Sequence, residues 1–325
     1  MTLQRRQLLQ LTVSAVMLSA MPSLAWSQTY PSRPVRVMVG YPAGGTYDLL
    51  ARLLGQWLSE RLGQPFVIEN RPGAASNIAT ETVVRAVPDG YTLLLAGPAN
   101  AINATLYDNL NFNFIRDIAP VAGVTREPLV MTVNPSLPIN SVPEFIAYAK
   151  SNPGKINMAS PGNGSSGHVA GELFKMMTGI DIVHVPYRGA APALTSLLGG
   201  QVQVYFGAAP ALIEYVRSST LRALAVTSAT RCQAMPEIST VGEFVPGYEA
   251  NAWYGIGAPK ATPAVIIERI NEEINFALGD SNINARLADQ GSTVIPGSPA
   301  DFRGLIAAET EKWAKVIRAA NIKVE

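Results

Sequence analysis

The sequence predicts an α/β protein of two lobes, each a mainly parallel sheet flanked by helices, joined by two hinge crossings. From residue 34 onward, β-rich runs alternate with helical periodicity, and this alternation restarts near residue 141. Three helical segments then end the chain without new strands, and such helices are expected to pack on an existing sheet. With 325 residues, 48% of them hydrophobic and 15% charged, the chain can bury about two domain cores.

The first lobe is expected to begin with strands and helices in βαβ order. The runs PVRVMVG, PFVIEN and YTLLLAG predict strands at 34–40, 65–70 and 91–97, separated by helices at 46–62 and about 76–86. In the first helix Leu50, Leu54 and Leu58 share an apolar face, and Gly63 is a natural C-terminal stop. This order predicts a parallel sheet with helices on both faces.

The second lobe is expected to follow the same order. Ser141 and Glu144 form a capping-box pattern ahead of a helix that ends near Ser151. The runs KINMAS, IDIVHVPY, QVQVYFG and LRALAVTS predict strands at 155–160, 180–187, 201–207 and 221–228. Helices are expected from the loop PGNGSSGH to about Thr178 and again after RGAAP.

The C-terminal part is expected to return to the first lobe. Residues 236–259 are predicted to be irregular, and helices follow at about 263–279, 282–290 and 298–320. Lobe 1 would then comprise 28–126 and 250–325, and lobe 2 would comprise 127–249. The crossings are expected near 125–128 and 248–252.

Residues 1–27 predict a cleaved secretory signal. Arg5 and Arg6 precede an apolar stretch, and the small residues Ala25 and Ser27 favour cleavage near Ser27. A retained membrane anchor is less favoured because polar residues interrupt the stretch, and the arginine pair leaves the Sec and twin-arginine routes both open. Cleavage removes two arginines and no acids, which leaves 23 Lys+Arg against 24 Asp+Glu. The signal predicts an exported protein, and the charge balance predicts no nucleic-acid partner.

Cys232 is the single cysteine, so no intramolecular disulfide can form. A lone thiol could serve as a nucleophile, but no histidine stands near it in sequence, and a tolerated small residue is the favoured interpretation. The chain contains no GK[ST] phosphate loop, no H-E-x-x-H pair and no cysteine cluster. We therefore expect no metal and no cofactor.

Two glycine-rich loops at strand-to-helix junctions are the candidate functional features. In open α/β sheets, ligands collect where strands end and helices begin, and YPAGGTYD at 41–48 lies at such a point. Gly44 and Gly45 let the backbone approach a ligand, and the free N–H groups of the next helix form an anion cradle. From this loop alone, a glycine turn without a ligand is equally favoured.

The second loop, SPGNGSSGH at 160–168, also leaves a predicted strand and enters a predicted helix. It adds the hydroxyls of Ser165 and Ser166 and the ring of His168. Two cradles on two lobes predict a ligand with two acidic ends. Four or five such donors can reach about 8 kcal/mol, which is a micromolar affinity. Arg71 and Arg188 stand near other loops and could assist, although solvated or structural arginines are at least as common.

Enzyme interpretations are less favoured. The sequence GSSGH has His168 where the nucleophile motif G-x-S-x-G needs glycine, so a triad would need Ser165 or Ser166 and a distant carboxylate. Residues 162–167 spell GxGxxG, but this signal is weak in an exported protein, and we interpret it as an anion cradle. His184 is expected to be packed or held by a hydrogen bond.

Seven segments resemble, in order, the motifs of the tripartite tricarboxylate transporter substrate-binding receptors, also called the Bug family. They are YPAGGTYDLLAR, VIENRPGAASNIA, PDGYTLLLAGPA, INMASPGNGSSGHVAGELF, HVPYRGAAPALTSLLGGQVQ, LRALAVTS and YEANAWYGIGAP. The resemblance implies a two-lobed periplasmic binding protein fold of type II-like topology, located in the periplasm. It implies a receptor that closes on a small carboxylate and passes it to membrane permease subunits, without catalysis or cofactor.

We expect this receptor to be a monomer. One alternative is an orphan receptor that reports its ligand to a sensor protein, since both would use the same pocket. Another, less favoured, is an exported serine hydrolase.

The resemblance also implies the residues of the ligand site. The first loop would hold one carboxylate, partly through ordered water, and Asp48 is expected to cap the helix start or hold the loop rather than touch the ligand. The implied ligand-binding residues are Tyr41, Ala43, Gly44, Gly45, Thr46, Asp48, Ala74, Ser76, Asn77, Asn163, Ser165, Ser166, His168, Arg188, Gly189, Ala190 and Gly207.

Two positions depart from what is common in the resembled family. Many relatives carry acidic residues in the segment 201–210, where this chain has Gln203 and Gly207. An acid there could pair with an ammonium group, so its absence predicts a ligand without one, such as a di- or tricarboxylate or an aromatic carboxylate. Ser76 replaces a common glycine, and either adds a hydroxyl or fills space.

Overall fold

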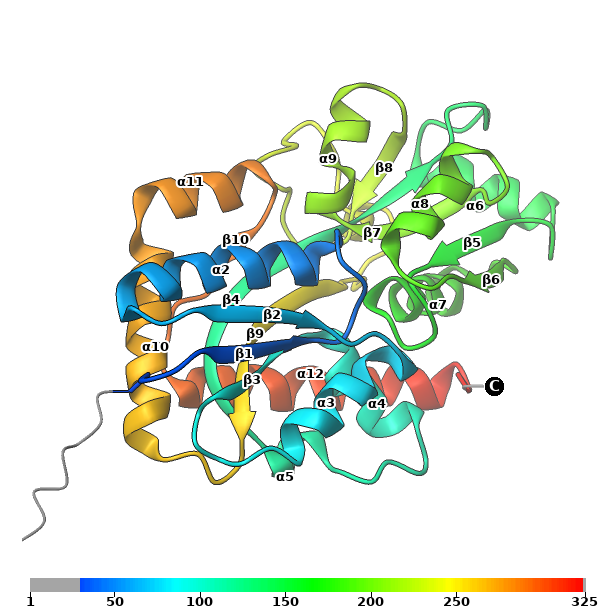
Figure 1. Cartoon of the computed structure of the whole chain (residues 1–325). Helices are drawn as coiled ribbons and strands as arrows, with labels where there is room; N and C mark the ends of the chain where they lie inside the picture. The colour runs from blue at the N-terminus through cyan, green and yellow to red at the C-terminus, as the bar shows by residue number, and fades with distance from the viewer. Residues whose placement is uncertain (1–29, 324–325) are drawn as a thin grey trace, which may run out of the picture. The chain divides into compact units, whose positions relative to one another are not determined.

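A mixed sheet with strand order β2-β1-β3-β9-β4-β7-β5-β6 organises the computed structural model, and β8 and β10 also pair with β4 (Figure 1). The structure describes residues 30–323, and from Arg33 onward they form one compact unit. The predicted signal at 1–27, with its arginine pair and cleavage point, lies outside the described residues. No helix between residues 30 and 323 is both long and apolar enough to cross a membrane.

The strands are β1 Val35–Val39, β2 Phe66–Asn70, β3 Thr92–Ala96, β4 Ile118–Val133, β5 Asn157–Ser160, β6 Val183–Pro186, β7 Val204–Ala208, β8 Arg222–Val226, β9 Asn251–Pro259 and β10 Thr293–Val294. The α-helices are α2 Thr46–Leu62, α3 Asn77–Val84, α4 Pro98–Leu106, α5 Phe114–Asp117, α6 Val142–Ser151, α7 Ser166–Thr178, α8 Ala190–Leu198, α9 Ala209–Arg217, α10 Ala264–Gly279, α11 Ser281–Asp289 and α12 Pro299–Ala319. Two short 3₁₀ turns are η2 Ala74–Ser76 and η3 Val241–Glu243.

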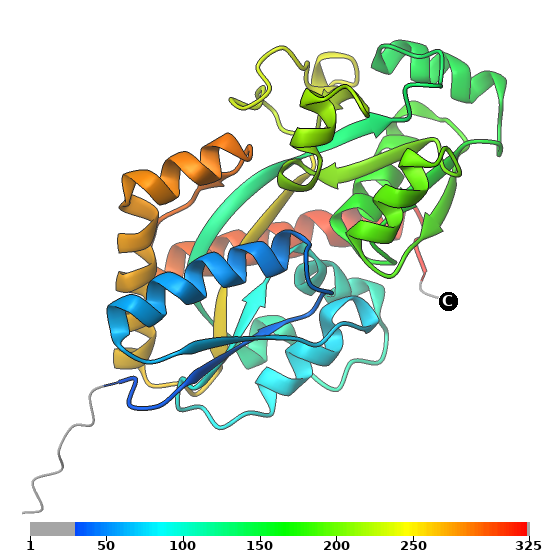
Figure 2. The ribbon, with the colours of Figure 1, turned by 45° about the horizontal axis from the view of Figure 1, so that its top comes forward.

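The sheet is parallel at its two ends and antiparallel in the middle. Strand β1 pairs in parallel with β2 and β3, and β5 pairs in parallel with β6 and β7. Between these groups, β4 and β9 pair antiparallel to each other, and β4 continues beyond β9 to pair with β7 and β8. In both ribbon views β4 runs from the part of the sheet beside α2 to the part beside α8 and α9 (Figures 1 and 2).

The prediction of an irregular stretch at 236–259 is wrong, because its last nine residues form β9. All nine are buried, between β3 and β4. A strand covered on both faces lacks alternating polar and apolar residues, and Gly255 and Gly257 look like breaks in the sequence. Helices α4 and α9 were also not predicted, whereas α10, α11 and α12 lie close to their predicted positions.

Helix ends follow the predicted capping chemistry closely. Helix α2 ends at Leu62, and Gly63 adopts a left-handed conformation with φ of 70° and donates its N–H to Ser59 O. At α6, Ser141 Oγ accepts a hydrogen bond from Glu144 N, as a capping box requires. The carboxylate of Glu144 reaches Asn140 N instead of Ser141 N, so only half of the predicted box forms.

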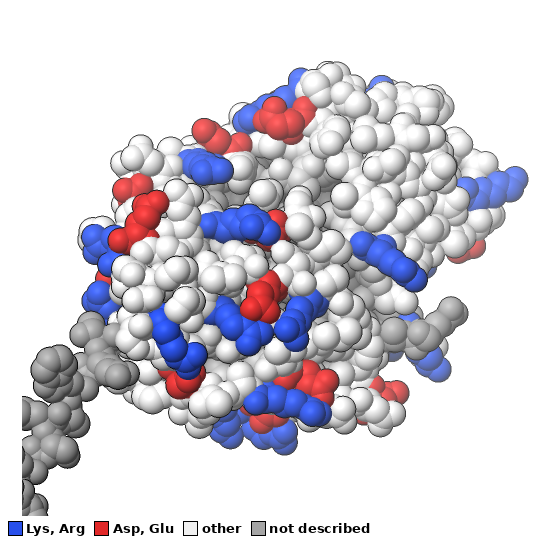
Figure 3. All heavy atoms as spheres, viewed as in Figure 1, with Lys and Arg blue, Asp and Glu red and all other residues white. Residues whose placement is uncertain are grey.

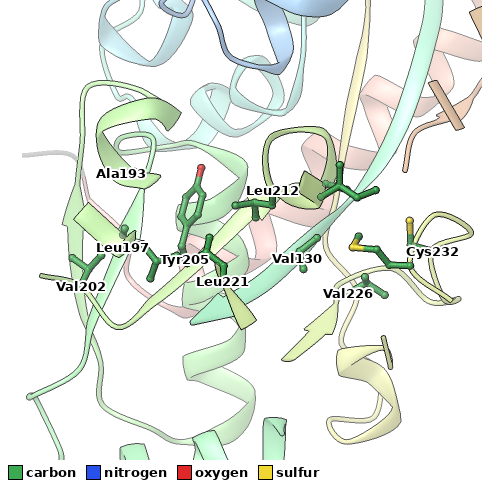
Figure 4. Close-up of a cluster of buried hydrophobic side chains, with 13 residues drawn as sticks. Val130, Ala193, Leu197, Val202, Tyr205, Leu212, Leu221, Val226 and Cys232 are labelled. Carbon is green, nitrogen blue, oxygen red and sulfur yellow. The ribbon is translucent and has the colours of Figure 1, made fainter. Parts of the chain in front are cut away.

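Hydrophobic side chains from β4, β7, β8, α8 and α9 form a buried cluster (Figure 4). Its members include Val130, Leu197, Tyr205, Leu212 and Val226. Burial of one such large side chain contributes roughly 1.5–3 kcal/mol, so this cluster can hold β7 and the start of α9 rigidly. Cys232 belongs to the same cluster and is buried, in agreement with the interpretation of a small packed residue.

Charges of both signs mix over the surface that carries α2 and β2, and no extended region of one sign is seen in that view (Figure 3). Beneath the surface, Glu127 of β4 is fully buried where this strand continues from its pairing with β9 to its pairing with β7. Ser292 Oγ donates to Glu127 Oε1 at 2.9 Å, and Oε2 has no partner in the described part of the chain. Burial raises the pKa of Glu127 to about 7, although the hydrogen bonds from Ser292 and Thr125 act in the opposite direction.

Replacing Glu127 with Gln is expected to change the pH dependence of stability. An unfolded glutamate titrates near 4.5. Between about pH 4.5 and 7 the folded wild type therefore holds more protons than the unfolded chain, and its free energy of unfolding falls as pH rises. Glu127→Gln removes this titration, so at pH 8 the variant should be more stable than the wild type by about 1–3 kcal/mol.

Urea unfolding at pH 5 and pH 8 measures this difference. Glu272→Gln, which removes the same charge from an exposed position of α10, is the control and should follow the wild type. Equal pH dependence in Glu127→Gln and wild type would show that the buried carboxyl titrates normally.

Candidate functional site

Two strand-to-helix loops meet at the middle of the sheet. The loop 40–45 joins β1 to α2, and the loop 161–165 joins β5 to α7. A third loop, 187–189, leads into α8, and a Cβ placed on Gly189 would stand only 3.3 Å from Pro42 Cγ. In both ribbon views the loop before α2 lies beside the start of α8 (Figures 1 and 2). The glycine loops singled out in the sequence therefore converge on one region.

Each glycine loop is held by a hydrogen bond to a side chain four residues later. Gly44 N–H donates to Asp48 Oδ2 at 3.0 Å, and Gly164 N–H donates to His168 Nδ1 at 3.2 Å. The φ angles of these glycines are +86° and +74°, in the left-handed region that disfavours other residues. Asp48 and His168 are buried in the first turns of α2 and α7. We call these two side chains the loop braces.

Asp48 holds the loop, as expected, and does not cap the helix, because the N-cap position is occupied by Gly45. Its carboxylate also forms an ion pair with Arg52 at 2.9 Å. Burial alone would raise the pKa of Asp48, but hydrogen bonds from Arg52 and from Gly44 N–H outweigh it and hold the pKa below its usual value. The brace is therefore ionised, and Arg52 offsets its charge.

His168 stacks on His184, with ring centroids 3.8 Å apart and planes inclined by 11°. Burial lowers the pKa of His168 to about 3 and that of His184 to about 4, so both rings are neutral at neutral pH. Ser165 Oγ accepts from the backbone N–H of His168, and no hydrogen bond joins Ser165 or Ser166 to either ring within residues 30–323. The serine hydroxyl that does meet a ring is that of Ser160, whose Oγ lies 2.6 Å from His184 Nε2.

Two cavities that share part of their lining lie between the loops. The inner cavity has a volume of about 80 Å³ and the outer cavity about 560 Å³. Both are lined by Tyr41, Pro42, Pro161, Arg188 and Gly189. Arg188 is the one charged side chain that lines either cavity in the described part of the chain, and it has no hydrogen bond or ion pair there.

Twelve of the predicted site residues line these cavities. The inner cavity is lined by Tyr41, Ala43, Gly45, Thr46, Ser165, Ser166, Arg188, Gly189, Ala190 and Gly207, and the outer cavity by Tyr41, Ala74, Asn163, Arg188 and Gly189. Ligand contact by any of them is still a prediction. Arg71 does not line either cavity and lies 3.5 Å from the carboxylate of Glu69.

The other five predicted residues, Gly44, Asp48, Ser76, Asn77 and His168, line neither cavity. Ser76 is fully buried, and its hydroxyl occupies the space that a Cβ on Gly40 would need, so it fills space. Asn77 Oδ1 accepts a hydrogen bond from Asn103 Nδ2 at 2.9 Å. Of these five, Gly44 is exposed in the loop, and the other four are buried behind the walls of the site.

Aromatic residues that the sequence did not single out complete the inner wall. Tyr47 stacks on Tyr41 at 4.6 Å and meets the ring edge of Tyr254 at 4.8 Å. Burial raises the pKa of Tyr41, Tyr47 and Tyr254, so their hydroxyls stay protonated. The sequence gives no local signal for Tyr254, because its strand, β9, is buried on both faces and lacks alternation, and Tyr205 reaches the cavity from the core cluster.

Gly207 presents bare backbone to the inner cavity. A Cβ at this position would stand 2.4 Å from Tyr205 Cε1 and 2.7 Å from Leu212 Cδ1. No acidic side chain fits there without repacking these two residues.

Comparisons with known proteins agree with this geometry. The family model described as "Tripartite tricarboxylate transporter family receptor" matches residues 50–322. Protein BugT of Bordetella pertussis is 38% identical over 302 residues, which cover 92% of this chain and 93% of BugT.

Two solved structures extend the similarity to three dimensions. Rpa4515 of R. palustris, solved with adipate, has a TM-score of 0.88 at 38% identity, covering 90% of this chain and 99% of that one. MatC from Rhodopseudomonas palustris, solved with bound malate, has a TM-score of 0.84 at 30% identity, covering 89% of this chain and 100% of that one. The predicted fold and family are thus confirmed: this chain has the two-lobed periplasmic binding protein fold and belongs to the tripartite tricarboxylate transporter receptor family.

Proposed function

We propose that this protein is a periplasmic receptor that captures a small carboxylate between its lobes and passes it to the permease subunits of a tripartite tricarboxylate-type transporter. It would bind its ligand unchanged, without catalysis or cofactor. The observation that carries the proposal is that two helix N-termini, each behind a braced glycine loop, open onto one inner cavity. Structural relatives were solved with the carboxylates adipate and malate, which supports this ligand class.

The anion would be held mainly by backbone N–H groups. The first N–H groups of α2, at Thr46 and Tyr47, and of α7, at Ser166 and Gly167, have no partner within their helices. Each hydrogen bond to a carboxylate contributes about 1.5–3 kcal/mol, and each helix terminus adds roughly 0.3–1 kcal/mol. Four such donors give roughly 8 kcal/mol after association costs, which is a micromolar dissociation constant.

The cavity walls favour a carboxylate with an apolar body and no ammonium group. Apart from Arg188, the lining side chains are uncharged, and tyrosine, proline and alanine dominate the inner cavity. An ammonium group would find no carboxylate in either cavity, whereas a second carboxylate would find the unpaired guanidinium of Arg188. We therefore propose a dicarboxylate as the ligand, with one end in the inner cavity and the other near Arg188.

The lobes would be residues 28–126 with 250–325 and residues 127–249, closing by a hinge at the two crossings. Support comes from β4, which pairs with β9 up to Pro128 and with β7 from Leu129. We also propose that the protein is exported through a signal at 1–27 and that it acts as a monomer. An orphan receptor that serves a sensor protein would use the same cavities, and neighbouring genes for permease subunits distinguish the two.

Dicarboxylates are expected to stabilise the mature protein against heat, and amino acids are not. Binding to the folded state at 100 times the dissociation constant adds about 2.7 kcal/mol, which corresponds to a Tm increase of roughly 5 °C or more. A thermal-shift screen should show this increase with adipate or malate. Aspartate and glutamate, which carry an ammonium group, serve as the comparison. Stronger stabilisation by aspartate or glutamate than by every dicarboxylate without an ammonium group would refute the proposed ligand class.

Arg188→Gln is expected to weaken binding of dicarboxylates selectively. Removing one charge-assisted contact should raise the Kd for adipate about tenfold, while the Kd for hexanoate, which has the same chain length and one carboxylate, should change less than about threefold. Isothermal titration calorimetry measures both. Arg71→Gln is the control, because Arg71 lines neither cavity. Equal losses for adipate and hexanoate would place Arg188 away from the second carboxylate.

A further inference from the structure

The histidine pair is linked to the glycine loop 161–165 at two points, directly at Gly164 and through Ser160 at Gly162. His168 Nδ1 accepts the N–H of Gly164 at 3.2 Å. His184 Nε2 lies 2.6 Å from Ser160 Oγ, and that hydroxyl lies 3.1 Å from both the N–H and the carbonyl oxygen of Gly162. The two rings stack at 3.8 Å. The stacked histidine pair is therefore linked to both glycines of the loop with positive φ angles, Gly162 and Gly164.

We propose that the stacked pair His168–His184 is a positioning element that fixes the loop 161–165 in its ligand-binding geometry. This inference rests on the function proposed above, because it assumes that this loop and the start of α7 form one of the two cradles. Neither histidine lines the inner or the outer cavity, so each would act on the ligand through the loop.

The hydrogen bond from Gly164 defines the tautomer of His168, and that of His184 follows from the direction of the Ser160 hydroxyl. His168 Nδ1 accepts from Gly164 N–H, so the proton of this ring stands on Nε2. The hydroxyl of Ser160 has one proton, and if it donates to Gly162 O, then Gly162 N–H and His184 Nε2–H both donate to its oxygen. In this arrangement each of these hydrogen bonds has one donor and one acceptor, and both rings are neutral.

The surroundings keep both rings neutral. Burial is the largest cause of the lowered pKa of each histidine, and the positive charge of Lys175 acts in the same direction. Lys175 itself forms an ion pair with Glu172 at 3.0 Å, also on α7. A proton added to His168 Nδ1 would face the N–H of Gly164 and remove the acceptor that holds the loop.

A neutral brace suits a loop that receives an anion. In the other loop, Asp48 performs the same task with a negative charge, and Arg52 offsets that charge. His168 has no arginine partner in the described residues, and its imidazole supplies the acceptor without any charge. The planar ring also stacks, so His184 fixes its orientation.

Matched variants separate the hydrogen bond from the packing. His168→Phe keeps an aromatic ring over His184 and loses the acceptor, whereas His168→Asn places an amide oxygen near the position of Nδ1. Met177→Leu, at a partly exposed position near the end of α7, is the control. A second pair of variants covers the case in which His168→Phe does not fold. His184→Leu removes the polar contact with Ser160, and His184→Gln replaces it with an amide; both are followed at Gly162.

Amide hydrogen exchange in the ligand-free mature protein, followed by NMR, is the first measurement. Loss of one buried hydrogen bond should accelerate exchange at Gly164 about tenfold in His168→Phe, with His168→Asn within about threefold of wild type. The His184 variants should show a contrast in the same direction but smaller at Gly162, because Gly162 N–H donates to Ser160 Oγ and not to the ring. The second measurement is the Kd for adipate and for malate, which should rise about tenfold in His168→Phe and recover in His168→Asn.

Wild-type exchange at Gly164 in His168→Phe, or equal effects of His168→Phe and His168→Asn, overturns the inference. The proposed function fails in a different way: the wild type binds no carboxylate while the exchange contrast at Gly164 persists. That result would support the positioning role of the histidine pair and reject a carboxylate as the ligand.

Discussion

The hydrogen bond from a loop glycine to a side chain four residues later is the interaction on which this site depends. It forms twice, between Gly44 and Asp48 and between Gly164 and His168. In each case it occupies the N–H of the glycine and fixes a left-handed turn just before a helix. In the proposed function, the free N–H groups of that helix would then be the donors left for a ligand. Without these bonds the loops would pay an ordering cost on every binding event.

Binding without a buried salt bridge has a physical advantage for a transport receptor. A fully desolvated ion pair is costly to form and costly to break, whereas backbone donors at a helix terminus bind an anion with small reorganisation. Here Arg188 is exposed and lines the shared wall of the two cavities, so it can add affinity without a large desolvation cost. The walls made by Tyr41, Tyr47 and Tyr254 supply apolar contact together with protonated hydroxyls.

Much of this arrangement follows from local sequence. Helix α2 has the predicted bounds because a glycine turn precedes it and Gly63 ends it, and both glycine loops were found from their positions between strand and helix. Strand β9 was missed because burial on both faces removes the alternation by which strands are recognised. The stacking of His168 on His184 and the cluster around Tyr254 join separate elements, so no local pattern encodes them.

The central claim is that both helix N-termini donate to the same bound carboxylate. Backbone amide chemical shifts, followed by NMR while the mature protein is titrated with a carboxylate that raises its Tm, test this claim most directly. Large downfield proton shifts are expected at Thr46 or Tyr47 of α2 and, over the same concentration range, at Ser166 or Gly167 of α7. Shifts confined to one of the two helices would contradict it.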